Sequence, residues 1–547
     1  MPRVIIDNRE IDVPAGATLL DAARQLGIDV PALCYREGYR ANTTCMACVV
    51  KVVGRDEGTK ARRHEGKDAN AGRSDEEKWR HRGKFVPSCA TLAEDGMRVE
   101  SETEEVHAVR RAALDLLLSD HAGECRAPCQ HACPLGTDIP RMMRAVADER
   151  LDDAIAIVRD ADPLPATLSR VAVAFSERAC RRGRVDEPAS ISLMRRYVAD
   201  ADLASPAAHL PEKKPGSGRR VAIVGSGPAA LSAAYFLQRD GYACTLIDSA
   251  EQAGGELRAF PVEELQPSVL DAEIALIGKL GARFDLSASI EVGRVEALMR
   301  EYDAVLLTLP GLRDLAAHRL DDHAIVAREA DGNLFGAANA VKPRSQVLLA
   351  VADGKAAAVC IDQFLRGEAV KLPPKLHSVH ASRPLPDELA AMVADANAAP
   401  RVATPCACEA SLSNEQACQE AGRCLHCDCH KFADCTLRKY AEMYGVSTSQ
   451  YRGDRRHLQR RTDHPDVVFE PGKCILCGLC LQIAERAGEP IGLALEGRGF
   501  DTRVSVPFNE ALGKALRTSA AECVAVCPTG AIAWKREVGE GRRDGGT

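Results

Sequence analysis

The chain of 547 residues has room for about four domains of ordinary size. Hydrophobic residues make up 46% and charged residues 27%, which excludes a compositionally disordered protein. The net charge of −7 argues against nucleic acid as the main partner, and no stretch is apolar for long enough to predict a membrane span. The 22 cysteines stand out, because the first residues show no secretory leader. We therefore expect a cytoplasmic protein whose cysteines bind metal.

Apolar periodicity, linkers and charge predict a multidomain protein of α/β and α+β domains. The charged stretch is interpreted as a solvated insert, with a docking arm as the alternative. In chain order the predicted parts are a β-rich domain over residues 1–103 with the charged insert at 54–84, a helical domain at 104–204, a linker at 205–219, an α/β domain at 220–370, a connector at 371–405, a cysteine-rich segment at 406–465, a second one at 466–536 and a tail at 537–547.

The first cysteine group combines one loop with a returning strand. Thiolates placed in this way can hold a [2Fe–2S] cluster, although a CxxC pair can also bind zinc. The flanking segments LLDAARQLGIDVPALCYREG and SCATLAEDGMRVES resemble the [2Fe–2S] ferredoxin domain of the complex I iron–sulfur subunit and related hydrogenases. The resemblance implies a β-grasp fold and a [2Fe–2S] cluster, with the charged insert lengthening the loop before the fourth ligand. The four candidate ligands are Cys34, Cys45, Cys48 and Cys89.

The second group lies in LLSDHAGECRAPCQHACPLGTDIPRMM, where three cysteines recur at every fourth position after a histidine. This segment resembles the N-terminal helical domain of the glutamate synthase small subunit and dihydropyrimidine dehydrogenase, which carries two [4Fe–4S] clusters. Two of the ligand positions that the resemblance implies hold Ala172 and Ser176, so we expect one of the clusters to be missing. The candidate ligands of the other are Cys125, Cys129, Cys133, Cys180 and, as an alternative to a bystander role, His121.

The third group places four cysteines within twelve residues, in RCLHCDCHKFADC. Four thiols so close can surround one [4Fe–4S] cluster or one zinc ion. The electron-transfer setting favours the cluster. Its candidate ligands are Cys424, Cys427, Cys429 and Cys435, with Cys406 and Cys408 as substitutes.

The fourth group follows the bacterial ferredoxin pattern, in which two halves exchange their fourth cysteine. The second cluster has lost ligands at Ala484, Arg517 and Ala520, which leaves Cys523 as a remnant. The segment CILCGLCLQIAERAGEPIGLALEGRGF resembles the ferredoxin-like part of complex I, hydrogenase and formate dehydrogenase electron-transfer subunits. We expect one [4Fe–4S] cluster, on Cys474, Cys477, Cys480 and Cys527.

A buried strand at residues 220–224 runs directly into GSGPAA, a turn that lets a pyrophosphate approach a helix N-terminus. An aspartate 23 residues after the first glycine can accept a hydrogen bond from a ribose hydroxyl. The segment resembles the FAD-binding half of the glutamate synthase small subunit and implies FAD as a cofactor. The candidate FAD-binding residues are Gly225, Gly227, Ala230, Asp248, Gly254, Gly255 and Asn339.

Two departures from that family change the expectation. No second GxGxxG motif occurs, and nothing of domain size fits between the strand at 302–308 and Asn333, so the nicotinamide-binding domain is expected to be missing. The closing motif ends in Ala338 and Asn339 where the family has Gly-Asp, so an uncharged amide replaces a carboxylate. A Rossmann scaffold without flavin is the alternative.

These features predict an iron–sulfur flavoprotein that transfers electrons within an oxidoreductase complex, with one [2Fe–2S] cluster, three [4Fe–4S] clusters and FAD. No catalytic residue is predicted, so substrate chemistry is expected on a partner chain. By resemblance, the partners are an NAD(P)H/FMN-binding subunit and a catalytic subunit of the formate dehydrogenase, hydrogenase or 2-oxoacid oxidoreductase type. The alternatives are an autonomous NAD(P)H-dependent flavoenzyme and a scaffold with a vestigial flavin fold.

Overall fold

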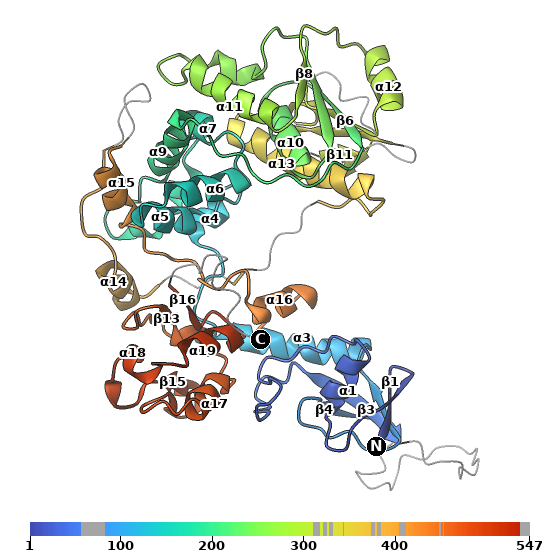
Figure 1. Ribbon diagram of the computed structural model, residues 1–547, viewed down its shortest axis with the longest axis vertical. Coiled ribbons are helices and arrows are strands. Elements are labelled where there is room, and N and C mark those ends of the chain that lie inside the picture. The colour runs from blue at the N-terminus through green and yellow to red at the C-terminus, as the bar shows by residue number, and fades with distance from the viewer. Residues whose placement is uncertain are drawn as a thin grey trace. The chain divides into compact units, whose positions relative to one another are not determined.

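The computed structural model describes most of the chain and divides it into two compact units (Figure 1). Unit 1 consists of Met1–Arg126, Leu376–Ala391 and Asp428–Thr547, and unit 2 of Ala127–Lys375 and Met392–Cys427. The described residues are 1–55, 83–309, 318–320, 325–327, 332–342, 344–372, 378–379, 384–403, 412–447, 450–451 and 453–535. Most of the predicted charged insert, part of the connector, the tail, Cys406 and Cys408 lie outside them.

The N-terminal part of unit 1 is a five-stranded sheet with one helix packed on it. Val4 and Ile6 are buried while the residues beside them are more exposed, as expected for a strand with one face on a core. Thr18 and Asp21 form a capping box that begins the helix. The central strands β1 and β5 are parallel and the other neighbours antiparallel. In sheet order the strands are β2 (Arg9–Asp12), β1 (Arg3–Ile6), β5 (Met97–Glu100), β3 (Val49–Arg55) and β4 (Lys84–Pro87), and the helix is α1 (Leu19–Gln25).

The rest of unit 1 consists of helices and two small antiparallel strand pairs, β13 with β16 and β14 with β15. Helices α17 and α19 pack together over a separate apolar core. The elements are α3 (Glu104–Ser119), α14 (Pro386–Ala394, whose end lies in unit 2), α16 (Thr436–Met443), β13 (Val467–Phe469), the 3₁₀ turn η5 (Pro471–Lys473), α17 (Leu479–Arg486), β14 (Ala494–Glu496), β15 (Arg503–Ser505), α18 (Leu512–Ala515), α19 (Ala520–Val526) and β16 (Ile532–Trp534).

Unit 2 begins with a bundle of short helices, three of which have a proline at the first or second position, where it suits the first helical turn. A helix from much later in the chain, α15, packs against α5 and α9. The helices are α4 (Pro128–Ala132), α5 (Ile139–Ala147), α6 (Leu151–Ala161), α7 (Pro165–Val171), α8 (Phe175–Arg178), η1 (Arg181–Arg184), α9 (Ile191–Ala204) and α15 (Asn414–Ala421).

The second part of unit 2 is a seven-stranded sheet in the order β10-β11-β12-β9-β6-β7-β8. The five strands from β12 to β8 are parallel, and β10 and β11 add an antiparallel edge. Helices α10 and α13 pack tightly because Gly354 lies against the Ala229 carbonyl, where a side chain would collide. The elements are β6 (Arg220–Val224), α10 (Pro228–Arg239), β7 (Ala243–Ile247), α11 (Pro267–Lys279), β8 (Arg283–Asp285), α12 (Val292–Glu301), β9 (Ala304–Leu307), β10 (His318–Leu320), β11 (Ile325–Ala327), β12 (Leu334–Ala337) and α13 (Val347–Leu365).

The predicted fold class is therefore confirmed: a β-grasp sheet, a helical domain, a Rossmann-type parallel sheet and a small C-terminal domain lie in one chain. Among the helices that the structure describes, none combines the length and hydropathy that a membrane span requires.

Candidate iron–sulfur and nucleotide sites

The first cysteine group comes together in the β-grasp domain. Cys34, Cys45, Cys48 and Cys89 are each at most 2% exposed. The strand register brings Cys89 close to Cys48 although the two are far apart in sequence. Val49 of β3 pairs with Pro87 of β4, so Cys48 and Cys89 flank the same end of the ladder. The Ser88 hydroxyl donates to the Cys48 carbonyl at 2.7 Å and fixes this turn.

The thiols of this group interact with one another. Hydrogen bonds from Cys45 and then Cys89 lower the pKa of Cys34, and a hydrogen bond from Cys89 lowers that of Cys48. The pKa values of Cys45 and Cys89 are raised, first by their bonds to Cys34. Four buried thiols that share protons suit a bound metal centre, because metal binding replaces those protons. The donor set fits a [2Fe–2S] cluster.

The fourth cysteine group lines a single apolar cavity in the C-terminal domain. Cys474 follows η5, Cys477 and Cys480 lie at the start of α17, and Cys527 ends α19. Burial raises the pKa of Cys474 to about 11. Four thiols around one apolar cavity are the donor set of a [4Fe–4S] cluster. The cavity is lined by Phe469, Cys474, Ile475, Cys477, Gly478, Leu479, Cys480, Val504, Cys527, Pro528, Thr529, Ala531 and Ile532.

The place of the second ferredoxin cluster is filled by apolar side chains. Ala484, Ala520 and Cys523 are buried in the core of the C-terminal domain, and Arg517 is exposed. The Cys523 thiol is fully buried and points to the Cys480 carbonyl at 3.8 Å. Burial raises its pKa to about 12. This packing supports the prediction that Cys523 is a remnant and not a ligand.

Unit 1 also brings Cys125 beside Cys429 and Cys435. The Cys429 amide donates to the Cys125 carbonyl at 3.3 Å, and Cys125 and Cys435 contact the same apolar cluster. Burial, followed by the charge of Cys429, raises the pKa of Cys435 to about 12. A glycine at position 530 lets the Cys429 sulfur lie against the backbone, since a side chain there would collide with it.

A buried ion pair that the sequence did not reveal lies in the same region. The Lys473 ammonium contacts a Glu470 carboxylate oxygen at 2.5 Å. Burial opposes the charge of Lys473, but Cys429 and Glu470 outweigh it, so the pKa of Lys473 is raised. His121 faces the pair; burial and then Lys473 lower its pKa to about 3. Its imidazole is therefore neutral and keeps a lone pair for a metal.

The other cysteines of the second and third groups lie in unit 2. Cys129 and Cys133 are buried in its main core, and Cys180, Cys424 and Cys427 pack against that core. Ala172 also packs there, and Ser176 is buried.

Each of these two predicted quartets is thus divided between the units. One is divided after Arg126 and the other after Cys427, and no spacing rule signals either division. In the described part of the chain, no three His, Cys, Asp or Glu side chains are close enough to share one metal ion.

The glycine-rich turn lies between β6 and α10. Gly225 has φ of +116°, and a side chain there would collide with Thr308. Ala230, at the third motif position, is fully buried. No side chain caps α10, so its first amides face the turn. Asp248 ends the next strand and accepts a hydrogen bond from Ser226 at 2.6 Å.

A carboxylate occupies the space in front of this turn. The second glycine pair, Gly254 and Gly255, has positive φ and brings Gly255 against Gly227. A Cβ at Gly227 would lie 2.8 Å from a Glu256 oxygen. The other Glu256 oxygen is 3.4 Å from the Asn339 amide. The predicted FAD-binding residues therefore surround one turn, but Glu256 places negative charge where a pyrophosphate would bind.

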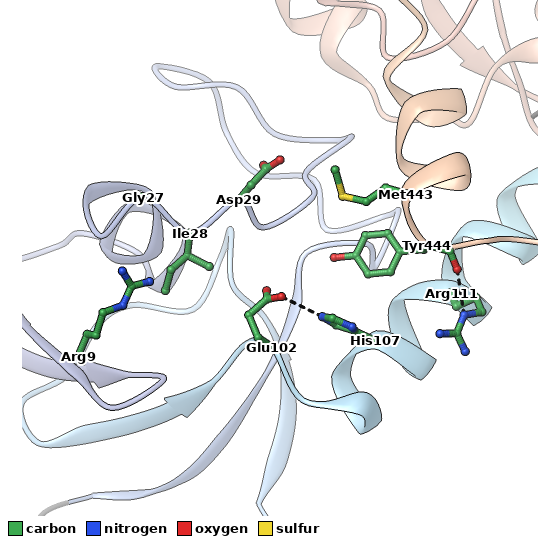
Figure 2. A pocket seen from close by; sticks show the side chains of 9 residues that line it. All are labelled: Arg9, Gly27, Ile28, Asp29, Glu102, His107, Arg111, Met443 and Tyr444. Carbon is green, nitrogen blue, oxygen red and sulfur yellow. Dashed lines mark hydrogen bonds and ion pairs between the residues drawn. The ribbon is translucent and has the colours of Figure 1, made fainter. Parts of the chain in front are cut away.

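A surface cleft in unit 1 contains none of the predicted site residues. Figure 2 shows Tyr444, at the end of α16, facing Glu102 and His107 across it. Glu102 pairs with His107 at 3.0 Å, and the Arg111 guanidinium donates to the Tyr444 carbonyl at 3.0 Å. The second contact joins α3 to the end of α16, so the cleft lies at a junction between elements.

Three parts of the chain match models of known protein families. Residues 3–70 match a 2Fe-2S iron-sulfur cluster binding domain, 102–206 match dihydropyrimidine dehydrogenase domain II, 4Fe-4S cluster, and 223–293 match an NAD(P)-binding Rossmann-like domain. The matches confirm that the chain contains domains of the 2Fe-2S, 4Fe-4S and dinucleotide-binding Rossmann types.

Several curated relatives are subunits of oxidoreductases. The chain is 36% identical over 204 residues to the NADP(+)-dependent formate dehydrogenase subunit beta of Moorella thermoacetica, covering 33% of this chain and 29% of the relative. It is 35% identical over 199 residues to the NADPH-Fe(3+) oxidoreductase subunit beta of Geobacter sulfurreducens, covering 35% and 28%. It is 33% identical over 264 residues to the NAD-dependent dihydropyrimidine dehydrogenase subunit PreT of Salmonella typhimurium, covering 45% and 60%. The matched part is thus less than a third of the first two relatives.

Proposed function

We propose that this chain is an iron–sulfur flavoprotein that carries electrons between other subunits of a cytoplasmic oxidoreductase complex. One partner would bind NAD(P)H and FMN, and the other would carry the catalytic site. The type of subunit named among the relatives supports this assignment. The resemblance of the N-terminal domain to the complex I iron–sulfur subunit suggests that electrons enter at the [2Fe–2S] site.

One observation carries the proposal: cysteines from all four groups meet at one apolar cluster inside unit 1. The cluster contains Cys34 and Cys45 of the first group, Cys435 of the third and Cys477 of the fourth, and Cys125 of the second group packs against it. Electron transfer slows steeply with distance, so centres that share a core are suited to exchange electrons without a diffusing carrier. Because this apolar cluster excludes water, it also affects the reduction potentials of the iron–sulfur clusters.

The first and fourth groups are joined by direct contacts. The Asn42 side chain donates to the Cys477 carbonyl at 2.6 Å, and the Arg40 amide donates to Gln482 at 3.0 Å. Gly478 follows with φ of +73°, and a Cβ there would lie 2.5 Å from the Asn42 nitrogen. The two ligand loops are therefore fitted to each other, which supports a fixed route between their clusters.

The flavin part of the proposal rests on the turn between β6 and α10. FAD bound there would exchange electrons in pairs or singly. The residues between β9 and β12 supply only the edge strands β10 and β11 in the described part of the chain, in place of a second nucleotide-binding domain. We therefore expect the chain to take electrons from NAD(P)H only through a partner subunit.

The test is anaerobic purification of the full chain, with counts of iron, sulfide, zinc and flavin. One [2Fe–2S] and three [4Fe–4S] clusters predict about fourteen iron atoms. Dithionite should reduce the clusters, and NADH or NADPH alone should not. Rapid reduction by NAD(P)H would contradict the relay and favour an autonomous flavoenzyme. Full iron content without flavin would favour a scaffold with a vestigial flavin fold.

A further inference from the structure

The division of two cysteine motifs between the units changes which thiols can share a cluster. In the second motif Cys125 belongs to unit 1, whereas Cys129 belongs to unit 2. In the third motif Cys427 belongs to unit 2 and Cys429 to unit 1. Each unit therefore receives part of both motifs.

In unit 2 the loop that carries Cys424 and Cys427 lies beside the turn that carries Cys180. The Arg182 guanidinium, two residues after Cys180, donates to the Arg423 carbonyl at 2.8 Å. It also donates to the Asn397 carbonyl at 2.8 Å. Arg182 is 1% exposed and Arg423 is fully buried, so this junction is part of the interior.

A second pair of ion contacts strengthens the junction. Arg423 contacts Asp186, which follows the turn of Cys180, at 3.2 Å, and Glu420 at 3.1 Å. Glu420 in turn accepts from the Ser190 amide at 2.8 Å. The late segment is therefore held against the helical domain by the buried charged groups of Glu420 and Arg423, directly before Cys424.

Cys129 comes to the same place through helix packing. It lies in α4, which packs against α8, and α8 ends two residues before Cys180. The Arg144 guanidinium of α5 lies 3.4 Å from the ring of His426, between Cys424 and Cys427 in the late loop. The three segments that carry Cys129, Cys180, and Cys424 with Cys427 are thus in contact within the helical domain.

Cys133 already has a contact within its own turn. Its sulfur lies 3.6 Å from the Thr137 hydroxyl. Lys355 of α13 binds the carbonyls of Leu135 and Ala161 at 3.0 and 3.3 Å. We therefore leave Cys133 out of the site, because its thiol contacts Thr137 in the segment after α4 that Lys355 of α13 also contacts.

We propose that Cys424 and Cys427 leave their own motif and complete a [4Fe–4S] site with Cys129 and Cys180 of the helical domain. Cys125, Cys429 and Cys435 then form a separate site in unit 1, with His121 as the candidate fourth ligand. The late loop supplies the two thiols that the helical domain lacks because Ala172 and Ser176 stand at its own ligand positions. The inference rests on the proposed iron–sulfur function and adds the ligand grouping.

Pairwise replacement tests this grouping in the full chain. Cys129→Ala and Cys424→Ala should each remove about four iron atoms, and the double variant should lose no more than either single variant. Cys424→Ala with Cys429→Ala should remove about eight, because the two thiols serve different clusters. The sequence-local grouping predicts the opposite: about eight for the first pair and about four for the second.

Two controls keep the result interpretable. Cys133→Ala should retain all the iron, and loss of about four atoms would overturn its exclusion. The [2Fe–2S] electron paramagnetic resonance signal should persist in every variant as a mark of intact folding.

Zinc is counted together with iron, so the additivity pattern reports the grouping for either metal. Zinc in place of iron, with the proposed pattern, would support the grouping and contradict the electron-transfer function; a chain without metal would contradict both.

Discussion

The β-grasp site of unit 1 and the helical-domain site of unit 2 reach a set of four thiols in different ways. In the β-grasp domain one strand pair carries Cys48 and Cys89 to the same place, although a charged insert separates them in sequence. In the helical domain a loop more than two hundred residues later lies against the site through buried arginines. A ladder tolerates an insertion because the register is set by the paired strands. A ligand lost from a helical motif can be replaced only by another segment.

The largest contrast is expected between two buried thiols of the C-terminal domain. Cys480→Ala should remove about four iron atoms, because Cys480 lines the apolar cavity. Cys523→Ala should remove none, because its thiol lies in the alanine-filled core. Iron counting and electron paramagnetic resonance after dithionite reduction measure both. Loss of iron from Cys523→Ala would show that the second ferredoxin cluster survives with other ligands.

A smaller effect is expected when the buried ammonium of Lys473, beside Cys429, is removed. Lys473→Met removes a positive charge near the Cys125 site and should lower the reduction potential of that cluster by on the order of 60 mV, a tenfold change for one electron. The double variant Lys473→Met/Glu470→Gln removes a charge of each sign and should return the potential toward the original value. Redox titration followed by electron paramagnetic resonance gives both values. If the unchanged protein and both variants had equal reduction potentials, the cluster would not lie beside Lys473.

Loss of the contact between the [2Fe–2S] loop and the ferredoxin-like loop should change the rate of electron transfer more than the iron content. Asn42→Ala removes the hydrogen bond to the Cys477 carbonyl, worth about 1 kcal/mol, and should slow electron transfer several-fold at unchanged iron content. Freeze-quench spectroscopy after mixing with dithionite resolves the two clusters. Gln482→Ala is the matched control, because it loosens the same interface through Arg40 without touching a ligand residue. If both variants slow transfer equally, the interface and not the Asn42 contact sets the rate.

The sequence predicted those features that depend on local chemistry. The β-grasp ladder, the strand–turn–helix of the dinucleotide fold and the CxxCxxC loop all follow from short-range patterns of apolar residues, glycines and cysteines. It did not predict the split of the motif at Cys427, because that depends on Arg182 and Arg423 meeting across 241 residues of chain. It also missed Lys473 and Glu470, whose importance comes from burial beside Cys429 rather than from their spacing.

The smallest effect is expected on FAD binding at the turn between β6 and α10 in unit 2. The cysteine sites are built from thiols that suit a metal, whereas the turn before α10 faces the Glu256 carboxylate. A negative charge at a helix N-terminus contributes about 0.3–1 kcal/mol, and a pyrophosphate would compete for that position. Glu256→Gln should therefore tighten FAD binding about two- to five-fold, measured by flavin fluorescence on titration of the apoprotein.

Glu264→Gln provides the control, since Glu264 is an exposed carboxylate on the same connection, eight residues after Glu256. It changes the net charge equally and should leave FAD affinity unchanged. An equal gain in both variants would mean that long-range charge, and not the position of Glu256, limits binding. Failure of either protein to bind FAD would mean that the glycine turn is retained for packing, because Gly225 and Gly255 are already required by their contacts with Thr308 and Gly227. Electrons would then pass through the chain by the iron–sulfur sites alone.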